Sequence, residues 1–307
     1  MKTFLSMTKR NIKLFFKDKG MFFTSLITPV ILLVLYSTFL AKVYRDSFTS
    51  ALPDGFGVSD KLIGGMVGGE LFSSLLAVCC VTVAFCSNLL MVQDKVSGVR
   101  KDFDISPTKK STLAFSYYVS SLLTTLIISF VATIACFAYI AIQGWFLSFG
   151  DVMFILLDVF MLTMFGTALS SVINFFLSTN GQASAVGTIV SAGYGFVCGA
   201  YMPIASFGQV LQNILAFLPG TYGTSLIRQR SLRGVFAEMS NQGFPPEVVE
   251  KIKDSVDCNI YFFGTQVSQG VMYAILLGSI ALLISAYVLI NFLHKKKSHK
   301  KTSKPKN

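Results

Sequence analysis

The sequence predicts an all-α membrane protein with six transmembrane helices. Of its 307 residues, 53% are hydrophobic and only 13% are charged, and the mean hydropathy is +0.63. A soluble domain typically carries about 25% charged residues. The apolar residues also come in blocks of roughly 20 or more, which is the length of helix that crosses a hydrocarbon core of about 30 Å. These observations predict a single multi-pass membrane domain.

Residues 1–20 are predicted to form an amphipathic helix on the membrane surface. Lysines recur every three or four residues, as at Lys9, Lys13 and Lys17, and apolar side chains such as Phe15 fall on the opposite side. A helix of this kind lies in the interface, with its lysines toward anionic head groups and its apolar face in the acyl boundary. A plain basic flank before the first span is the alternative interpretation.

Six apolar runs are predicted to span the membrane. They are residues 21–41, 70–92, 113–142, 151–176, 183–201 and 267–292. The first run is expected to remain attached rather than to act as a cleaved signal peptide, because it is too long and no small-x-small cleavage site follows it. Pro29 is expected to kink this first span.

Residues 42–69 and 202–266 are predicted to connect the spans on the opposite side from the termini. The first region is polar and rich in glycine, which favours turns. In the second, the apolar stretch 204–218 has only 15 residues and is flanked by prolines. It is too short to cross the bilayer, so a re-entrant hairpin or an interfacial helix is predicted. The polar residues 228–266 are expected to follow as an outer loop, with one small amphipathic helix.

The distribution of basic residues predicts the orientation. Residues 1–20, 93–112, 178–182 and the tail 294–307 together hold 18 of the 26 basic residues but only 4 of the 15 acidic ones. By the positive-inside rule, both termini of this plasma-membrane protein are expected to face the cytoplasm. The net charge of +11 is then a consequence of topology. No basic domain lies outside these flanks, so nucleic acid is not expected as a partner.

The charged segment QDKVSGVRKDFDISP, residues 93–107, lies between the second and third predicted spans. Such a segment cannot remain in hydrocarbon, so it is predicted to form a helix or turn at the membrane face, where a soluble protein can bind it. An ordinary solvated loop is the alternative. The candidate contact residues are Asp94, Lys95, Val96, Val99, Arg100, Lys101, Asp102, Phe103 and Asp104, among which Val96, Val99 and Phe103 would form an apolar ridge.

Polar and small residues within the spans are further candidates. Glu70 opens the second predicted span, either as a helix cap or as a functional group, and Asp158 lies about two turns into the fourth. A buried charge in a membrane is costly and usually tied to a pathway or partner, although a structural hydrogen bond would also explain Asp158. A face of small residues in the fifth span indicates a dimer seam, a pathway wall or packing within one protomer. Its members are Ser184, Gly187, Ser191, Gly195 and Gly199.

Catalytic and cofactor motifs are absent from the sequence. Both histidines, His294 and His299, lie in the basic tail, and no G-x-S-x-G, H-E-x-x-H or G-x-x-x-x-G-K-[ST] motif occurs. We therefore expect no enzyme active site, metal or cofactor in this chain. Five cysteines lie in predicted spans as small packing residues. Cys258 lies in the outer region, where a disulfide to Cys198 is an open alternative.

Three segments carry a resemblance to a known family. The first is the basic helix that leads into a proline-containing span (KRNIKLFFKDKGMFFTSLITPVILLVLY), which is similar to an elbow helix. The second is QDKVSGVRKDFDISP, which is similar to a coupling helix. The third is LPGTYGTSLIR, residues 218–228, which is similar to a Pro-x-Thr-Tyr segment. In this order on six spans, the chain resembles the membrane subunit of type-2 ABC exporters, the ABC-2 permease family. It departs from the family pattern at residues 114–116, which lack a lysine often found before the third span, and in a longer outer segment.

The resemblance implies a permease without an ATPase site of its own. Its partners would be two copies of a cytoplasmic ABC ATPase that binds ATP and Mg²⁺, a second identical or related permease, and membrane lipids. The charged segment 93–107 would be the site of ATPase coupling. The expected function is ATP-driven export of a hydrophobic or amphipathic substrate, such as a drug, an antimicrobial or a lipid-like molecule.

Other functions stay open at the level of sequence. Export of a lipid-linked polysaccharide or teichoic-acid-type glycan is one alternative. A gradient-driven secondary carrier is a second, although the internal repeat typical of many carriers is not seen. A membrane scaffold or immunity-type protein would have the same spans but no need of the charged helix.

Overall fold

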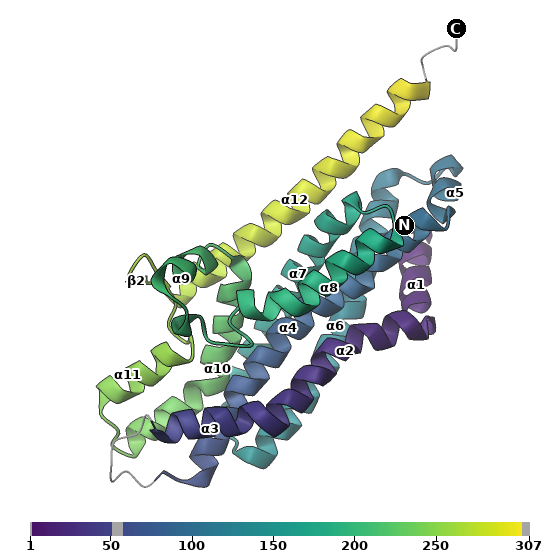
Figure 1. Ribbon diagram of the computed structural model, residues 1–307. Helices are drawn as coiled ribbons and strands as arrows, with labels where there is room; N and C mark the ends of the chain where they lie inside the picture. The colour runs from purple at the N-terminus through teal and green to yellow at the C-terminus, as the bar shows by residue number, and fades with distance from the viewer. Residues whose placement is uncertain (1, 51–57, 303–307) are drawn as a thin grey trace.

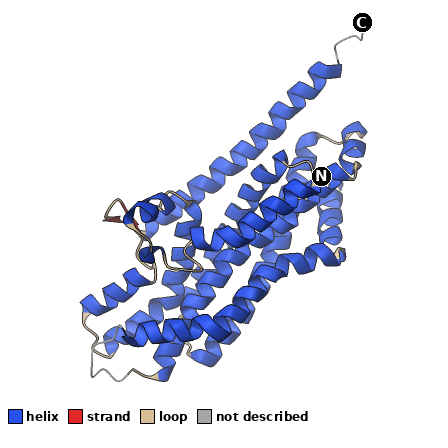
Figure 2. Ribbon diagram, in the orientation of Figure 1, coloured by secondary structure: helices blue, strands red, loops and turns tan. Residues whose placement is uncertain are grey.

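The computed structural model describes residues 2–50 and 58–302, and 84% of these described residues are helical. The helices form one elongated bundle (Figure 1). Figure 2 shows that β structure in the described part of the chain is limited to one pair of two-residue strands. These are β1 (Tyr261–Phe262) and β2 (Thr265–Gln266), which pair in antiparallel fashion. The prediction of an all-α protein is confirmed.

The bundle is built around α4 (Asp60–Val96), a helix of 37 residues and so about 55 Å long. Nearly all of its side chains are buried, as expected for a helix that is apolar on every side. It is surrounded by five other helices. These are α2 (Lys19–Leu35), α6 (Lys110–Gln143), α7 (Phe149–Phe176), α8 (Asn180–Val197) and α10 (Pro219–Asn241).

The start of α4 differs from the sequence-based prediction. The second span was expected from residue 70, after a glycine-rich loop, but the helix begins at Asp60, where the Ser59 hydroxyl caps the Leu62 amide. The glycines serve close packing rather than turns. A Cβ added at Gly69 would lie 2.5 Å from Leu232 Cδ2, and one added at Gly64 would lie 2.5 Å from the Gln143 carbonyl oxygen.

Five helical stretches in the described residues are long and apolar enough to cross a membrane. They are Lys19–Leu40, Asp60–Val96, Lys110–Gln143, Phe149–Phe176 and Gln269–Leu293. The remaining predicted span, residues 183–201, falls largely in α8. That helix has 18 residues and begins with Asn180, Gly181 and Gln182, so its average hydropathy is lower than that of the other five.

The chain between α8 and α12 contains more helix than the sequence predicts. After α8 come the short 3₁₀ turn η2 (Ile204–Ser206) and α9 (Gln209–Leu215), and α10 then continues well past Arg228, where a polar loop was expected. The predicted amphipathic helix is present as α11 (Pro246–Ser255). The last helix is α12 (Gln269–Thr302).

The N-terminal half also contains unexpected helix. Within residues 1–20, where a surface helix is predicted, the structure has the helix α1 (Lys2–Lys17), and α2 runs through Pro29 without ending there. It is followed by a π-helical turn η1 (Tyr36–Leu40) and by α3 (Ala41–Ser50), which occupies part of the predicted loop 42–69.

The two ends of the bundle are distinct (Figure 1). One end carries α1, the last turns of α4 and α7, the short helix α5 (Val99–Ile105) and the far end of α12. We call this the α5 end. The opposite end carries α3, α10 and α11, and we call it the α10 end.

The packing of α10 predicts the effect of a single methyl group. A Cβ added at Gly234 would collide with the backbone carbonyl of Phe146, in the connection between α6 and α7. Because backbone cannot move aside as a side chain can, Gly234→Ala should destabilise the protein by about 1–3 kcal/mol. The measurement is thermal unfolding of the purified protein in detergent.

Gly278→Ala in α12 is the matched control, because a Cβ there has no neighbour within 4 Å. It should leave the stability unchanged or raise it by about 0.5–1 kcal/mol through the helix propensity of alanine. Equal unfolding temperatures for the two variants would contradict the close approach of α10.

Candidate functional site

The charged segment at the α5 end forms a short helix at the surface. Gly98 has a φ of 85°, a left-handed conformation that glycine adopts without strain, and it turns the chain from α4 into α5. The side chains of Lys101 and Asp102 are exposed. Ile105, at the end of α5, is 87% exposed. The helix therefore presents both charged and apolar groups to its surroundings.

The Asp94 carboxylate makes its contacts inside the protein. It accepts two hydrogen bonds from Arg10 of α1, Nη1 to Oδ2 at 2.6 Å and Nη2 to Oδ1 at 3.0 Å. The Tyr117 hydroxyl donates a third at 2.5 Å from α6. The carboxylate raises the pKa of Arg10 above its ordinary value. Such bidentate pairs are strong and directional, so Asp94 joins α1, α4 and α6.

Lys95 is also engaged internally. Its Nζ donates to the carbonyl oxygens of Asn174, Phe175 and Leu177 at 3.2, 2.6 and 2.9 Å. These carbonyls lie at the C-terminus of α7, where backbone acceptors have no partner within the helix and a cation is favoured by the helix dipole. Lys95 therefore fixes the end of α7 to the end of α4.

The predicted apolar ridge of Val96, Val99 and Phe103 spans the end of α4 and α5 and does not form one face. The Phe103 ring packs in a cluster with Met7 and Leu113, and the Arg10 guanidinium lies 5.4 Å from its centroid. Val99 is half-buried, whereas Val96 is exposed. Sequence reasoning missed Ile105, although an isoleucine directly before Ser-Pro in a charged segment was a usable signal. The Asp104 side chain lies outside the described part.

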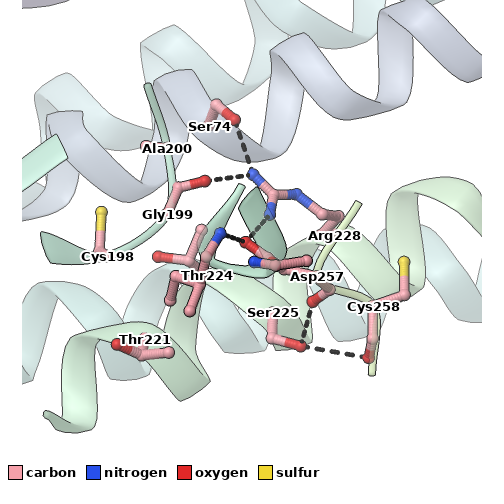
Figure 3. A network of polar contacts seen from close by, with 12 residues as sticks. Ser74, Cys198, Gly199, Ala200, Thr221, Thr224, Ser225, Arg228, Asp257 and Cys258 are labelled. Atoms are coloured by element: carbon pink, nitrogen blue, oxygen red, sulfur yellow. Dashed lines mark hydrogen bonds and ion pairs between the residues drawn. The ribbon is translucent and has the colours of Figure 1, made fainter. Parts of the chain in front are cut away.

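A second polar constellation lies deep in the bundle near the α10 end (Figure 3). Arg228 of α10 is fully buried. Its Nε lies 3.0 Å from Glu70 Oε2 of α4, and its Nη1 lies 3.4 Å from Asp257 Oδ2. Its Nη2 donates to Ser74 Oγ and to the Gly199 carbonyl, both at 2.9 Å. We call Arg228, Glu70 and Asp257 the buried charge cluster.

Asp257 extends this cluster to the turn after α8. Its carboxylate accepts hydrogen bonds from the backbone amides of Ile204, at 2.6 Å, and Ala205, at 2.9 Å. Burial raises the pKa of Asp257, while Arg228 and the two amides oppose that shift. The cluster therefore joins α4, α10, η2 and the segment before β1 by contacts whose charged side chains are buried.

The two acidic candidates of the spans both contact side chains of other helices. Glu70 does not cap a helix start, because it lies ten residues inside α4 and pairs with Arg228. Asp158 of α7 accepts a hydrogen bond from the Tyr273 hydroxyl of α12 at 2.7 Å. That contact is the structural hydrogen bond between neighbouring helices considered as one of its two interpretations.

Comparison with protein families decides the relationship. A sequence model described as ABC-2 type transporter matches residues 2–230. The chain belongs to the ABC-2 type transporter family. The matched region extends from α1 into α10 and so includes Arg228 and the whole α5 end. A search of curated proteins finds no match.

Membership gives the permease its general role. It is the transmembrane subunit of an ABC-2 type transporter and a multi-pass membrane protein. ABC-2 permeases pair with ABC ATPase subunits, which carry the ATP-binding sites, and the permease domain typically lacks such a site. In the described residues of this permease, no group of three or more His, Cys, Asp or Glu side chains is placed to hold a metal ion.

The small-residue face of α8 has two separate roles in the permease. Ser184, Gly187 and Ser191 line a groove of about 740 Å³ between α2, η1 and α8, with α4 side chains also contributing. Gly195 instead lies against the Tyr201 ring, and Gly199 makes the turn after α8 with a φ of 72°. Only the first three are therefore placed to face a ligand, a lipid or another subunit.

The cysteines of the permease are all free thiols in this structure. Cys198 and Cys258, the pair for which a disulfide was left open, are both buried and unbonded. Cys258 contributes a backbone carbonyl that accepts from the Ser225 hydroxyl (Figure 3). The two thiols therefore belong to the packed region around the buried charge cluster.

Removing Arg228 should destabilise the permease strongly. Arg228→Leu leaves Glu70 and Asp257 buried without a cation, and breaking a buried pair in this way typically costs about 3–5 kcal/mol. The expected result is a large fall in the unfolding temperature of the purified protein and a low yield in the membrane fraction.

Arg45→Leu is the control for the loss of an ion pair. Arg45 and Asp60 are 3.4 Å apart but well exposed, so their pair should contribute no more than about 1 kcal/mol. If both variants lowered the unfolding temperature equally, the buried charge cluster would not be a main source of stability.

Proposed function

We propose that this permease is the membrane subunit of an ATP-driven exporter that moves a hydrophobic or amphipathic molecule out of the cell. Two permeases, identical or related, would combine with two ATPase subunits at the α5 end. The observation that carries the proposal is α5 itself, a surface helix with exposed charged and apolar side chains that follows α4 where α4 is fixed to α1, α6 and α7.

The basic residues support a cytoplasmic location for the α5 end. In this proposal α8 is a sixth span, both termini are cytoplasmic, and α9 and the start of α10 form the turn that returns the chain at the outer side. The lysine-rich face of α1 then meets anionic head groups of the inner leaflet. The tail from residue 294 would lie on the same side as the ATPase.

The contacts at the base of α5 suggest how force would reach the bilayer. ATP-driven closure of the ATPases displaces α5, and Arg10, Asp94 and Lys95 transmit that displacement to α1, α4, α6 and α7 together. Because α4 is the central helix, its movement changes the spacing of the helices around it. Converting a 1:99 equilibrium into 99:1 takes about 5.5 kcal/mol of differential binding, which ATP at two sites can supply.

The groove beside α8 supports a hydrophobic or amphipathic substrate. Half of its lining residues are leucine, isoleucine or aromatic, and small hydroxyl-bearing side chains such as Thr28, Ser184 and Ser191 lie among them. Such a surface suits an apolar body with a few polar groups. We propose the groove as the place where the substrate, or the second permease, contacts this one.

Substitution of Ile105 tests the position of the ATPase. Ile105→Ser removes an exposed apolar contact without disturbing the core, so the permease should insert and fold normally. ATPase copurification should fall by about tenfold or more if the residue is a buried anchor of the interface. The measurement is the amount of ATPase retained on the tagged permease, followed by ATP hydrolysis of the complex in liposomes.

Ile142→Ser is the matched control, because Ile142 is 84% exposed but lies at the far end of α6. It should leave copurification unchanged. Full ATPase binding by the Ile105→Ser permease would place the interface elsewhere.

Filling the groove tests its role in transport. A Cβ at Gly187 has no neighbour within 4 Å, so Gly187→Leu should fold normally while its side chain occupies the groove. Efflux of a lipophilic fluorescent dye from cells that also express the ATPase should fall several-fold.

Gly193→Leu provides the comparison on the same helix. Gly193 also has open space around its added Cβ, but it is not among the residues that line the groove. Equal efflux by the two variants would argue against the groove as a substrate or subunit contact.

A further inference from the structure

A second pocket, of about 680 Å³, opens at the α10 end between α10, α11 and the start of α12. It is separate from the groove beside α8 and from the buried charge cluster. Figure 1 shows these three helical segments and the β1–β2 hairpin grouped on the same side of the bundle. Gln269, the first residue of α12, lines the pocket, so the pocket lies where an apolar span begins. On a membrane protein, that is the level of the lipid head groups.

The pocket is basic. Among the described residues that line it, Arg230, Arg233 and Lys253 are cationic and none is acidic. Arg230 and Arg233 lie one turn apart on α10, so both side chains leave the same face of the helix. Lys253 approaches from α11.

Carboxylates outside the lining partly balance these charges. Asp151 lies 3.3 Å from Arg233, and Glu250 lies 2.7 Å from Lys253. Asp158 is close enough to Arg230 to interact electrostatically, and the Tyr273 hydroxyl lies between the two groups. Asp158 and Tyr273 belong to the interface of α7 with α12 rather than to the pocket wall.

Arg230 is held in position but is incompletely hydrogen-bonded. Its guanidinium lies 4.2 Å from the centroid of the Phe154 ring, and its Nη2 donates to Gln269 Oε1 at 3.2 Å. Gln269 in turn donates to Gln229 Oε1 at 2.6 Å. The Nε of Arg230 is buried and has no hydrogen-bond partner in the described residues. Buried donors are normally satisfied, and this N–H, beside the Tyr273 hydroxyl, is available to an acceptor bound in the pocket.

We propose that this pocket binds a phosphate group, in the form of a phospholipid head group or free inorganic phosphate. A planar guanidinium forms paired hydrogen bonds to two phosphate oxygens, and Arg233 on the same face of α10 and Lys253 on α11 add positive charge. The remaining wall offers neutral amides such as Gln229 and Asn259 for the other oxygens. The inference does not rest on the ATPase, the substrate or the proposed orientation.

The test uses the purified full-length permease in neutral detergent. Its unfolding temperature and ligand affinity are measured with three probes: inorganic phosphate, short-chain phosphatidylglycerol, and the matching diacylglycerol that lacks phosphate. Both phosphate-containing probes should bind and the diacylglycerol should not. Arg230→Gln should weaken phosphate binding on the order of tenfold, because charge-assisted hydrogen bonds are lost.

Three variants keep the result decisive. Lys251→Gln removes the same charge from α11 at an exposed residue outside the pocket lining and should bind normally. Arg230→Lys retains charge without the planar donor set and should bind with intermediate affinity. Should Arg230→Gln not fold, the affinity of Lys253→Gln relative to Lys251→Gln decides the question.

The outcomes separate the two sources of phosphate. Tighter binding of phosphatidylglycerol than of inorganic phosphate assigns the site to a lipid head group, and the reverse assigns it to the free anion. Equal weakening by Arg230→Gln and Lys251→Gln would reduce the effect to general electrostatics and overturn the proposal. Absence of binding by both phosphate-containing probes would also overturn it.

Discussion

The structure depends on the burial of α4 together with the charge compensation that this burial requires. A helix of this length in the centre of the bundle has no exposed face on which to place a carboxylate, yet it carries Glu70. Arg228 supplies the opposite charge from α10, and its guanidinium also contacts Asp257, Ser74 and the Gly199 carbonyl. An isolated charge there would be prohibitively costly. The position of α10, the turn after α8 and the segment before β1 are therefore fixed by one side chain.

At the opposite end of α4, two charged side chains are also paired with partners on other helices, with a different consequence. Asp94 and Lys95 are adjacent in sequence but point to different neighbours, one to Arg10 and Tyr117 and the other to the end of α7. Both are positioning residues rather than surface contacts. The exposed part of α5 is thus a small area on a firmly attached base. That combination suits a surface through which a partner moves the bundle, because little of the displacement would be lost in a flexible connection.

The sequence predicted the helical class and most of the long apolar helices because each depends on local apolar length or periodicity. The prediction from sequence failed where the same residue type favours one structure in water and another inside a helix bundle. Glycines before residue 70 favour turns in water, but in α4 they allow neighbouring backbones to approach. Arg228 follows an apolar stretch and so indicated the start of a polar loop. Its partners Glu70 and Asp257 are distant in the chain, so the local sequence did not indicate that they pair with it. An acid and a base that each interrupt an apolar segment were the only signal for that pair.

The burial of all six thiols has a practical consequence. A thiolate is the reactive form of cysteine, and burial in apolar surroundings both blocks reagents and raises the pKa, as at Cys258. The natural chain should consequently show little background with maleimide probes. A single cysteine introduced on α5 and another beside the α8 groove would then accept spectroscopic labels selectively, and the separation between the labels could be followed through the nucleotide cycle without first stripping the native thiols.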